Sequence, residues 1–183
     1  MSTSLAPGFL VAMPNLLDPN FNRSVVLLCA HSGEGAFGLV LNRPMDITVG
    51  QICNEAGIAW KGDQSHRIFR GGPVEPQRGW IIHDSRRMYE GSECIDTDLA
   101  FTPSQEGLVA YGKTPDGRFR LVLGYAGWGP MQLDREMEEG CWLKIPADPS
   151  IVFEQEAGRV WEAALRTVGV DPLHLVDGGS MVH

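Results

Sequence analysis

The chain has 183 residues, of which 43% are hydrophobic and 21% are charged, and its net charge is −8. This length and composition predict one globular domain, residues 1–183, whose core needs neither disulfides nor a metal for stability. The acidic excess lies in residues 91–183, which hold 15 acidic and 7 basic side chains, whereas residues 1–90 hold 8 of each. Because nucleic-acid-binding proteins usually carry a basic face, this balance argues against direct contact with DNA or RNA.

The sequence also indicates a cellular location. No apolar run approaches the ~20 residues of a membrane-spanning helix, and the N-terminus lacks the basic and apolar regions of a signal peptide. The four cysteines, at positions 29, 53, 94 and 141, form no Cys-x-x-Cys pair. We therefore expect a cytoplasmic protein with reduced cysteines and no association with a membrane.

Short apolar runs predict three strands in the first quarter of the chain, at residues 9–13, 25–30 and 37–41. Uninterrupted apolar runs in a sequence are typical of strands that are covered on both faces. Residues 33–38 match the dinucleotide pattern G-x-G-x-x-G, but the apolar run 39–41 and Pro44 leave no room for the helix that such a site requires. The segment is therefore predicted to be a hairpin loop, and no nucleotide or other cofactor is expected.

The remaining elements are strands with short helices between them. A capping box at Thr48 and Gln51 predicts the first helix, and a second such box predicts a helix from about residue 103. Further strands are expected at 67–70, 80–83, 119–125 and 141–145, with an acidic helix near 131–139, a helix over 156–168 and a loose tail from about 175 to 183. Because strands and helices do not alternate regularly, the pattern favours an α+β fold with a mixed sheet.

Two arginines beside strand ends are the first candidates for a binding site. Arg43 follows a buried strand directly, and Arg70 directly precedes Gly71 and Gly72. A guanidinium group suits bidentate capture of a carboxylate or phosphate, and paired glycines let backbone approach a ligand closely. Structural ion pairs and a tight turn explain the same residues equally simply.

Three further side chains are candidates from their places in the sequence. Trp128, between two glycines, either covers the edge of the core or borders a binding surface. His31 and His83 each end an apolar strand, where they would either make ordinary hydrogen bonds or serve as an acid–base group in an enzyme. No metal-ligand spacing and no hydrolase or phosphate-loop signature is present, so no catalytic or metal residue is assigned.

Several segments together resemble the bacterial YqgE/AlgH family. The matching segments, which keep their order and spacing across nearly the whole chain, are Gly8–Pro14, Asn22–Val26, Gly38–Pro44, Gly71–Val74, Arg78–Trp80 with His83, and Gly124–Trp128 with Gln132 and Leu133. One departure is Met131, because similar proteins usually carry glycine there.

The resemblance implies an α+β fold with a partly barrel-like sheet, but it implies little about activity. Members are of largely unknown function and are sometimes labelled transcriptional regulators. Three hypotheses remain open: a binding or regulatory module for a small anion or a protein, with a cleft near Arg43, Arg70–Gly72, His83 and Trp128; an enzyme of unrecognised class using His31 or His83; and a transcriptional regulator acting indirectly or by contact with DNA.

Overall fold

The computed structural model describes residues 4–89, 91–113 and 118–179. Ten strands are present in these residues, and their bounds are β1 Gly8–Ala12, β2 Val25–Ser32, β3 Gly35–Val40, β4 Pro44–Thr48, β5 Arg67–Arg70, β6 Val74–Asp84, β7 Glu93–Cys94, β8 Leu99–Pro103, β9 Phe119–Trp128 and β10 Trp142–Ile145. The helices are α1 Val49–Glu55, α2 Ser104–Lys113, α3 Gln132–Glu138, α4 Pro149–Phe153, α5 Val160–Arg166 and α6 Pro172–Gly179, with a 3₁₀ turn, η1, at Ala157–Arg159.

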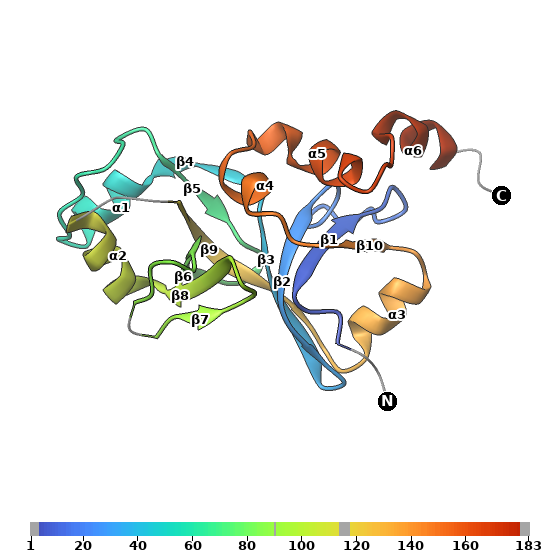
Figure 1. The fold of residues 1–183 in the computed structure, drawn as a ribbon, viewed down its shortest axis with the longest axis horizontal. Coiled ribbons are helices and arrows are strands. Elements are labelled where there is room, and N and C mark those ends of the chain that lie inside the picture. The colour runs from blue at the N-terminus through green and yellow to red at the C-terminus, as the bar shows by residue number, and fades with distance from the viewer. Residues whose placement is uncertain (1–3, 90, 114–117, 180–183) are drawn as a thin grey trace.

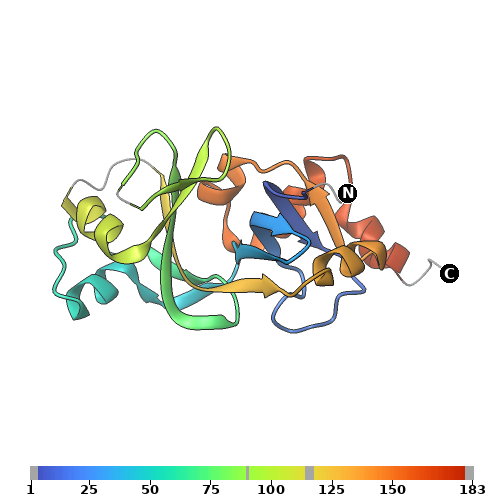
Figure 2. The same cartoon turned by 90° about the horizontal axis from the view of Figure 1, so that it is seen from below.

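The strands form one curled, half-barrel sheet, which confirms the predicted α+β fold and its partly barrel-like form. The main path runs β10-β1-β2-β3-β9-β6-β8-β7, and β5 joins it beside β9 with β4 on its outer side. The pairing of β5 with β9 is parallel, whereas the other pairings within the described residues are antiparallel. Figures 1 and 2 show that the long strand β9 runs from one half of the molecule into the other.

Strand β9 joins the two halves of the sheet because different parts of it pair with different neighbours. Its first half pairs with β5 and β6, and its last residues pair with β3. Gly124 lies between these parts with a φ of 80°, a conformation that favours glycine. This residue therefore marks the position at which the strand changes partners.

The N-terminal strands are buried on both faces, as their uninterrupted apolar runs predict. Phe9 and Val11 of β1 belong to a cluster with α4 and α5, whereas Leu10 and Ala12 belong to a second cluster that includes residues of α3 and β10. Strands β2 and β3 meet in a two-residue turn, since Ser32 pairs with Gly35. The hairpin predicted for residues 33–38 is thus present, and the residues from 35 onward belong to the strand itself.

The helices gather at the two ends of the curled sheet. Helices α1 and α2 lie at one end, and α3, α5 and α6 lie at the other (Figures 1 and 2). Helix α1 begins with the predicted capping box, in which the Thr48 side chain accepts from the Gln51 backbone and the Gln51 side chain accepts from the Thr48 backbone. Helix α6 includes residues 175–179 of the segment expected to form the tail, and residues 180–183 lie outside the described part.

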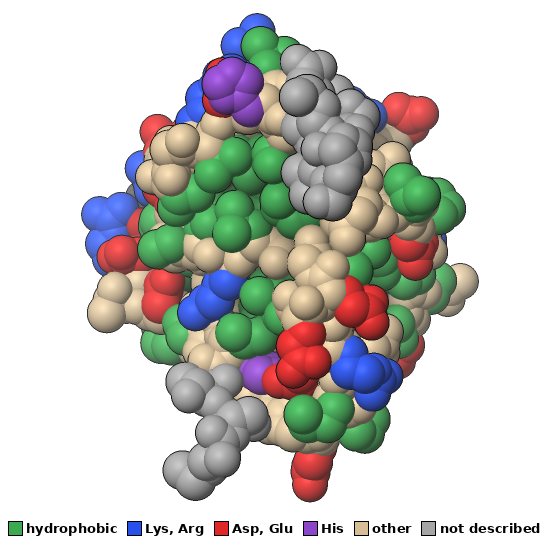
Figure 3. All heavy atoms as spheres, turned by 90° about the vertical axis from the view of Figure 1, so that its right-hand side faces the viewer, with side chains coloured by type: hydrophobic (Ala, Val, Ile, Leu, Met, Phe, Trp, Pro, Cys, Tyr) green, Lys and Arg blue, Asp and Glu red, His purple; other side chains and the backbone are tan. Residues whose placement is uncertain are grey.

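The end that carries α3, α5 and α6 exposes many apolar side chains (Figure 3). Leu173 of α6 is 69% exposed and Leu17, in the loop after β1, is 78% exposed. No helix within the described residues is both long enough and apolar enough to cross a membrane.

Candidate functional site

Arg43 and Arg70 lie directly opposite each other at the end of the β4–β5 ladder. Pro44 pairs with Phe69, and one step further the Arg70 backbone N–H donates to the Arg43 carbonyl oxygen at 2.8 Å. Residues directly opposite in an antiparallel pair project from the same face of the sheet. The register therefore places the two arginines, 27 positions apart in sequence, beside each other on one face.

The two arginines line a small pocket of about 180 Å³. The pocket is completed by residues from the loop after β1, from β3 and from the turn before β6: Pro19, Asn20, Val40, Gly72 and Pro73. Such a volume is below the usual range for drug-sized ligands, roughly 300–1,000 Å³, and suits a small ion or the charged end of a larger molecule.

Neither arginine has a carboxylate partner among the described residues. Arg43 donates to the Asn22 carbonyl oxygen, and no side-chain hydrogen bond of Arg70 is present within this part of the chain. By contrast, Arg67 on the same strand as Arg70 pairs with Asp46 at 3.0 Å. Burial lowers the pKa of Arg43, because removal from water penalises its unpaired positive charge.

Gly71 and Gly72 fill a structural need beside this pocket. A Cβ atom on Gly71 would lie 2.3 Å from the Gly124 carbonyl oxygen, and one on Gly72 would lie 2.1 Å from the Tyr125 carbonyl carbon. The chain after β5 therefore packs directly against the backbone of β9. Gly72 lines the pocket, whereas Gly71 lies beside it, where its N–H donates to Leu123 and its carbonyl accepts from Val40.

His83 does not reach this pocket. It is 1% exposed within β6, where Nδ1–H donates to the Asp84 carbonyl at 3.0 Å and Nε2 lies 2.7 Å from the Thr102 hydroxyl. A carbonyl can only accept, so in neutral His83 Nε2 accepts from Thr102, which in turn accepts from Ser92 at 2.7 Å. The Tyr89 backbone N–H also donates to the Ser92 hydroxyl. All the hydrogen bonds in this series therefore run in one direction, toward Nε2 of His83.

Burial also lowers the pKa of His83, and this is the largest influence on it. Protonation would reverse the Thr102 hydroxyl, and the Ser92 hydroxyl would then lose the acceptor of its proton. The network therefore favours neutral imidazole and leaves neither ring nitrogen free for a substrate.

His31 is likewise engaged at both nitrogens. The Leu5 backbone N–H donates to Nδ1 at 2.9 Å, so Nε2 carries the proton and donates to Asp134 of α3 at 3.2 Å. The His31 side chain is 1% exposed. This pair links the N-terminal segment, β2 and α3, and it lacks the free lone pair that a general base requires.

Trp128 lies in the second core cluster, away from the arginines. It is 6% exposed and packs against Phe21 and Trp142, with ring centroids 6.2 and 6.0 Å away. Its indole N–H donates to Glu136 at 3.0 Å, and Trp142 donates to the same carboxylate oxygen at 2.9 Å. Of the proposed site residues, Arg43, Arg70, Gly71 and Gly72 thus come together, whereas His83 and Trp128 occupy two other places.

Residues 9–173 match the AlgH-like family, DUF179. The chain belongs to this family. An UPF0301 protein of Myxococcus xanthus is 43% identical over 180 residues, covering 97% of this chain and 98% of its own. A second UPF0301 protein, from Vibrio cholerae, is 40% identical and covers 94% of this chain and 96% of its own.

Two solved structures share the AlgH-like fold. The solution structure of the AlgH protein from Pseudomonas aeruginosa has a TM-score of 0.78 and 35% identity, covering 97% of this chain and 95% of its own. A crystal structure of a Corynebacterium diphtheriae protein has a TM-score of 0.72 and 28% identity, with 93% and 89% covered. These relatives establish family and fold, and their names state no ligand or reaction.

Sequence reasoning missed two features of this AlgH-like chain. The loop residues Pro19 and Asn20 complete the arginine pocket, although the sequence shows them only as part of a turn.

A second, larger cavity of about 610 Å³ lies elsewhere and is lined by aromatic residues of β3, β6 and β8. The sequence feature that could have indicated this cavity is the segment Arg78–Trp80, which is among the segments that carry the family resemblance and which supplies two of its lining residues. Within the described residues, no group of three His, Cys, Asp or Glu side chains is placed to hold a metal ion.

Proposed function

We propose that this AlgH-like protein is a cytoplasmic binding or regulatory module whose Arg43–Arg70 pocket holds a small carboxylate or phosphate. The observation that carries the proposal is the direct apposition of two arginines that have no acidic partner in the described part of the chain. Like charges opposite each other across a ladder destabilise a sheet, so a bound anion would relieve their repulsion.

The chemistry of the pocket favours an oxyanion over a neutral ligand. Guanidinium groups bind carboxylate and phosphate oxygens through paired N–H donors, and the partial burial of Arg43 strengthens such contacts. Asn20 also lines the pocket. The small volume favours a compact ion, or the charged end of a metabolite or peptide.

Charge distribution supports a local site over an extended one. The whole chain carries −8, so a long polyanion such as DNA would meet net repulsion, whereas a small anion needs only the two arginines. The cytoplasmic placement is supported by the four cysteines, all of which are free.

The test is thermal unfolding in the presence of phosphate, phosphorylated metabolites and carboxylates at constant ionic strength. A ligand at 100 times its dissociation constant should stabilise the wild-type protein by about 2.7 kcal/mol. Arg70→Gln should lose this stabilisation. Arg67→Gln, on the same strand and also exposed, should retain it because Arg67 already pairs with Asp46. Equal stabilisation of the two variants, or none for the wild type with any anion, would refute the proposal.

A further inference from the structure

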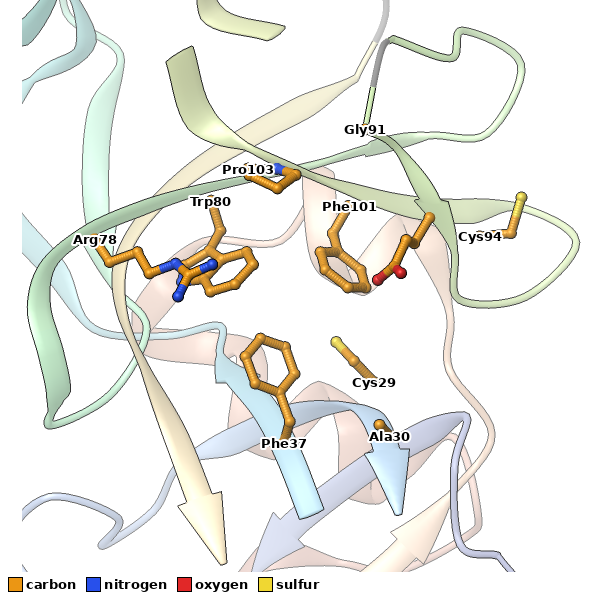
Figure 4. Close-up of a pocket in the computed structure, with 10 residues that line it drawn as sticks. Cys29, Ala30, Phe37, Arg78, Trp80, Gly91, Cys94, Phe101 and Pro103 are labelled. Carbon is orange, nitrogen blue, oxygen red and sulfur yellow. The ribbon is translucent and has the colours of Figure 1, made fainter. Parts of the chain in front are cut away.

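The larger cavity lies on the concave side of the curled sheet, between β2–β3 on one side and β6–β8–β7 on the other. Its volume is about 610 Å³, which is within the range of small-molecule sites. Figure 4 shows Phe37 and Cys29 rising from one side toward Trp80 and Phe101 on the other. The cavity shares no lining residue with the Arg43–Arg70 pocket.

Three aromatic rings pack against one another in the wall of this cavity, where Trp80 and Phe101 keep 6% and 9% of their surface exposed. The centroid of Phe37 lies 5.0 Å from that of Trp80 and 5.8 Å from that of Phe101, and Trp80 and Phe101 are 5.7 Å apart. Such clusters offer both ring faces and edges to a further aromatic ring. The surface therefore favours a planar, unsaturated ligand.

One end of the cavity offers donors to an anion. The Arg78 guanidinium lies 4.5 Å from the centroid of the Trp80 ring, and its ion pair with Glu75 is long, at 3.6 Å, and about half exposed. Exposed pairs of this kind contribute little stability, so Arg78 can turn toward a ligand at small cost.

Trp80 forms part of the cavity wall beneath Arg78. Its indole N–H is buried and has no hydrogen-bond partner in the described residues. The other four tryptophans, Trp60, Trp128, Trp142 and Trp161, all donate, at 2.8–3.1 Å. Buried donors are normally satisfied, but no space large enough for a water molecule reaches this N–H, so it is an unsatisfied group inside the cavity wall.

The other end of the cavity carries an acceptor. Glu93 of β7 pairs with Phe101, which pairs with Ile82, so Glu93 is displaced from Arg78 by four positions in the strand direction, about 13 Å at ~3.3 Å per residue, and lies two strands to the side. Glu93 forms no ion pair with any described residue. Burial, and then the nearby Glu93, raise the pKa of the Cys29 thiol, so the wall between the two charges is uncharged.

We propose that this cavity binds a planar aromatic ligand with a carboxylate at one end, held by Arg78, and an ammonium at the other, held by Glu93. The aromatic ring of the ligand lies on Phe37 and Phe101. This second site is independent of the anion pocket.

The experiment follows the five indole N–H resonances in ¹H–¹⁵N spectra during titration with 4-(aminomethyl)benzoate. The Trp80 resonance should shift, because Trp80 lines the cavity and feels the ring current of the bound ligand, while the other four stay in place. Benzoate and benzylamine, which each keep one charge, should bind about tenfold more weakly, the typical effect of losing one charged hydrogen bond. The saturated analogue 4-(aminomethyl)cyclohexanecarboxylate should also bind more weakly, because it cannot stack.

Two variants separate the ends of the site. Arg78→Gln should weaken benzoate binding and leave benzylamine binding unchanged, and Glu93→Gln should do the reverse. Arg159→Gln, an exposed arginine in an i,i+3 pair, and Arg70→Gln, in the other pocket, should change neither. A Trp80 resonance that stays in place with every probe, or equal effects of the two variants on both single-charge probes, would overturn the proposal.

Discussion

Single residues in unusual environments explain several features that pattern analysis could only note. Met131 has a φ of 59° and precedes α3 without a side-chain cap. The left-handed region favours glycine, so the structure gives a physical reason for the glycine that the family resemblance implies at this position. The turn needs this backbone conformation rather than close approach to a ligand.

Met131→Gly should therefore stabilise the protein, by about 0.5–1 kcal/mol. A non-glycine residue in this conformation costs roughly 1–2 kcal/mol, and the greater freedom of glycine in the unfolded chain offsets part of the gain. Met131 is 45% exposed, so little packing is lost. Urea unfolding measures the change, and Met131→Ala is the control that keeps the strain. A glycine variant less stable than the alanine variant would contradict this explanation.

His83 should make the protein less stable in acid. Its pKa is lowered in the folded state by burial, so the unfolded chain binds a proton first as the pH falls through about 6.5. The stability due to neutral His83 is complete above that pH and declines as the pH falls toward the lower folded pKa. Urea unfolding from pH 7.5 to 5 should show this slope, and His83→Gln should reduce it. An unchanged slope would show that other groups cause it.

At the scale of one element, the acidic helix α3 is attached to the core by a carboxylate. Glu136 accepts from the indoles of Trp128 and Trp142 through one oxygen and from the Gln132 side chain, at 2.9 Å, through the other. Gln132 also accepts from the Gly129 backbone at 3.0 Å. The acidic character of α3, which argues against a phosphate site at this turn, thus also has a structural purpose.

Glu136→Ala should lower the free energy of unfolding by about 2–4 kcal/mol, because two mostly buried indole N–H groups would lose their acceptor. Glu138, on the same helix, is exposed and serves as the matched control. Its replacement by alanine should change stability by no more than about 0.5 kcal/mol. Chemical denaturation compares the two, and near-equal values would mean that the indole bonds contribute little.

At the scale of the whole molecule, the curl of the sheet depends on close backbone contact at one crossing. Gly71 and Gly72 meet Gly124 and Tyr125 where β9 changes partners, and a Cβ on Gly124 would lie 2.3 Å from the Gly72 carbonyl oxygen. This crossing supports one wall of the arginine pocket. It also holds together the two halves of the sheet. The aromatic cavity lies between these halves.

Gly124→Ala should cost about 3 kcal/mol more than Gly140→Ala. Both glycines have positive φ, 80° and 73°, so both variants carry similar backbone strain. A Cβ on Gly140 meets nothing within 4 Å, whereas the one on Gly124 displaces backbone. Thermal unfolding should show the difference, with loss of soluble protein as its extreme form. Similar melting temperatures of the two variants would mean that the backbone at this crossing shifts at little cost to make room for a Cβ atom.

The sequence by itself determined the local structure and the family. Thr48 and Gln51 define the start of α1 because a capping box involves neighbours only, and the apolar runs of β1 and β2 predict burial on both faces because side chains alternate. The sequence also shows functional residues that are neighbours in the chain, and Arg70 with Gly71 and Gly72 is such a candidate site.

Only the tertiary structure decided which distant side chains meet. Arg43 joined Arg70 because the β4–β5 register places them opposite each other, whereas His83 points into the core from β6 and Trp128 lies beyond the bend of β9. The aromatic cavity likewise brings together β3, β6 and β8, which are far apart in the chain. Register and curl depend on long-range pairing, which composition and spacing do not encode locally.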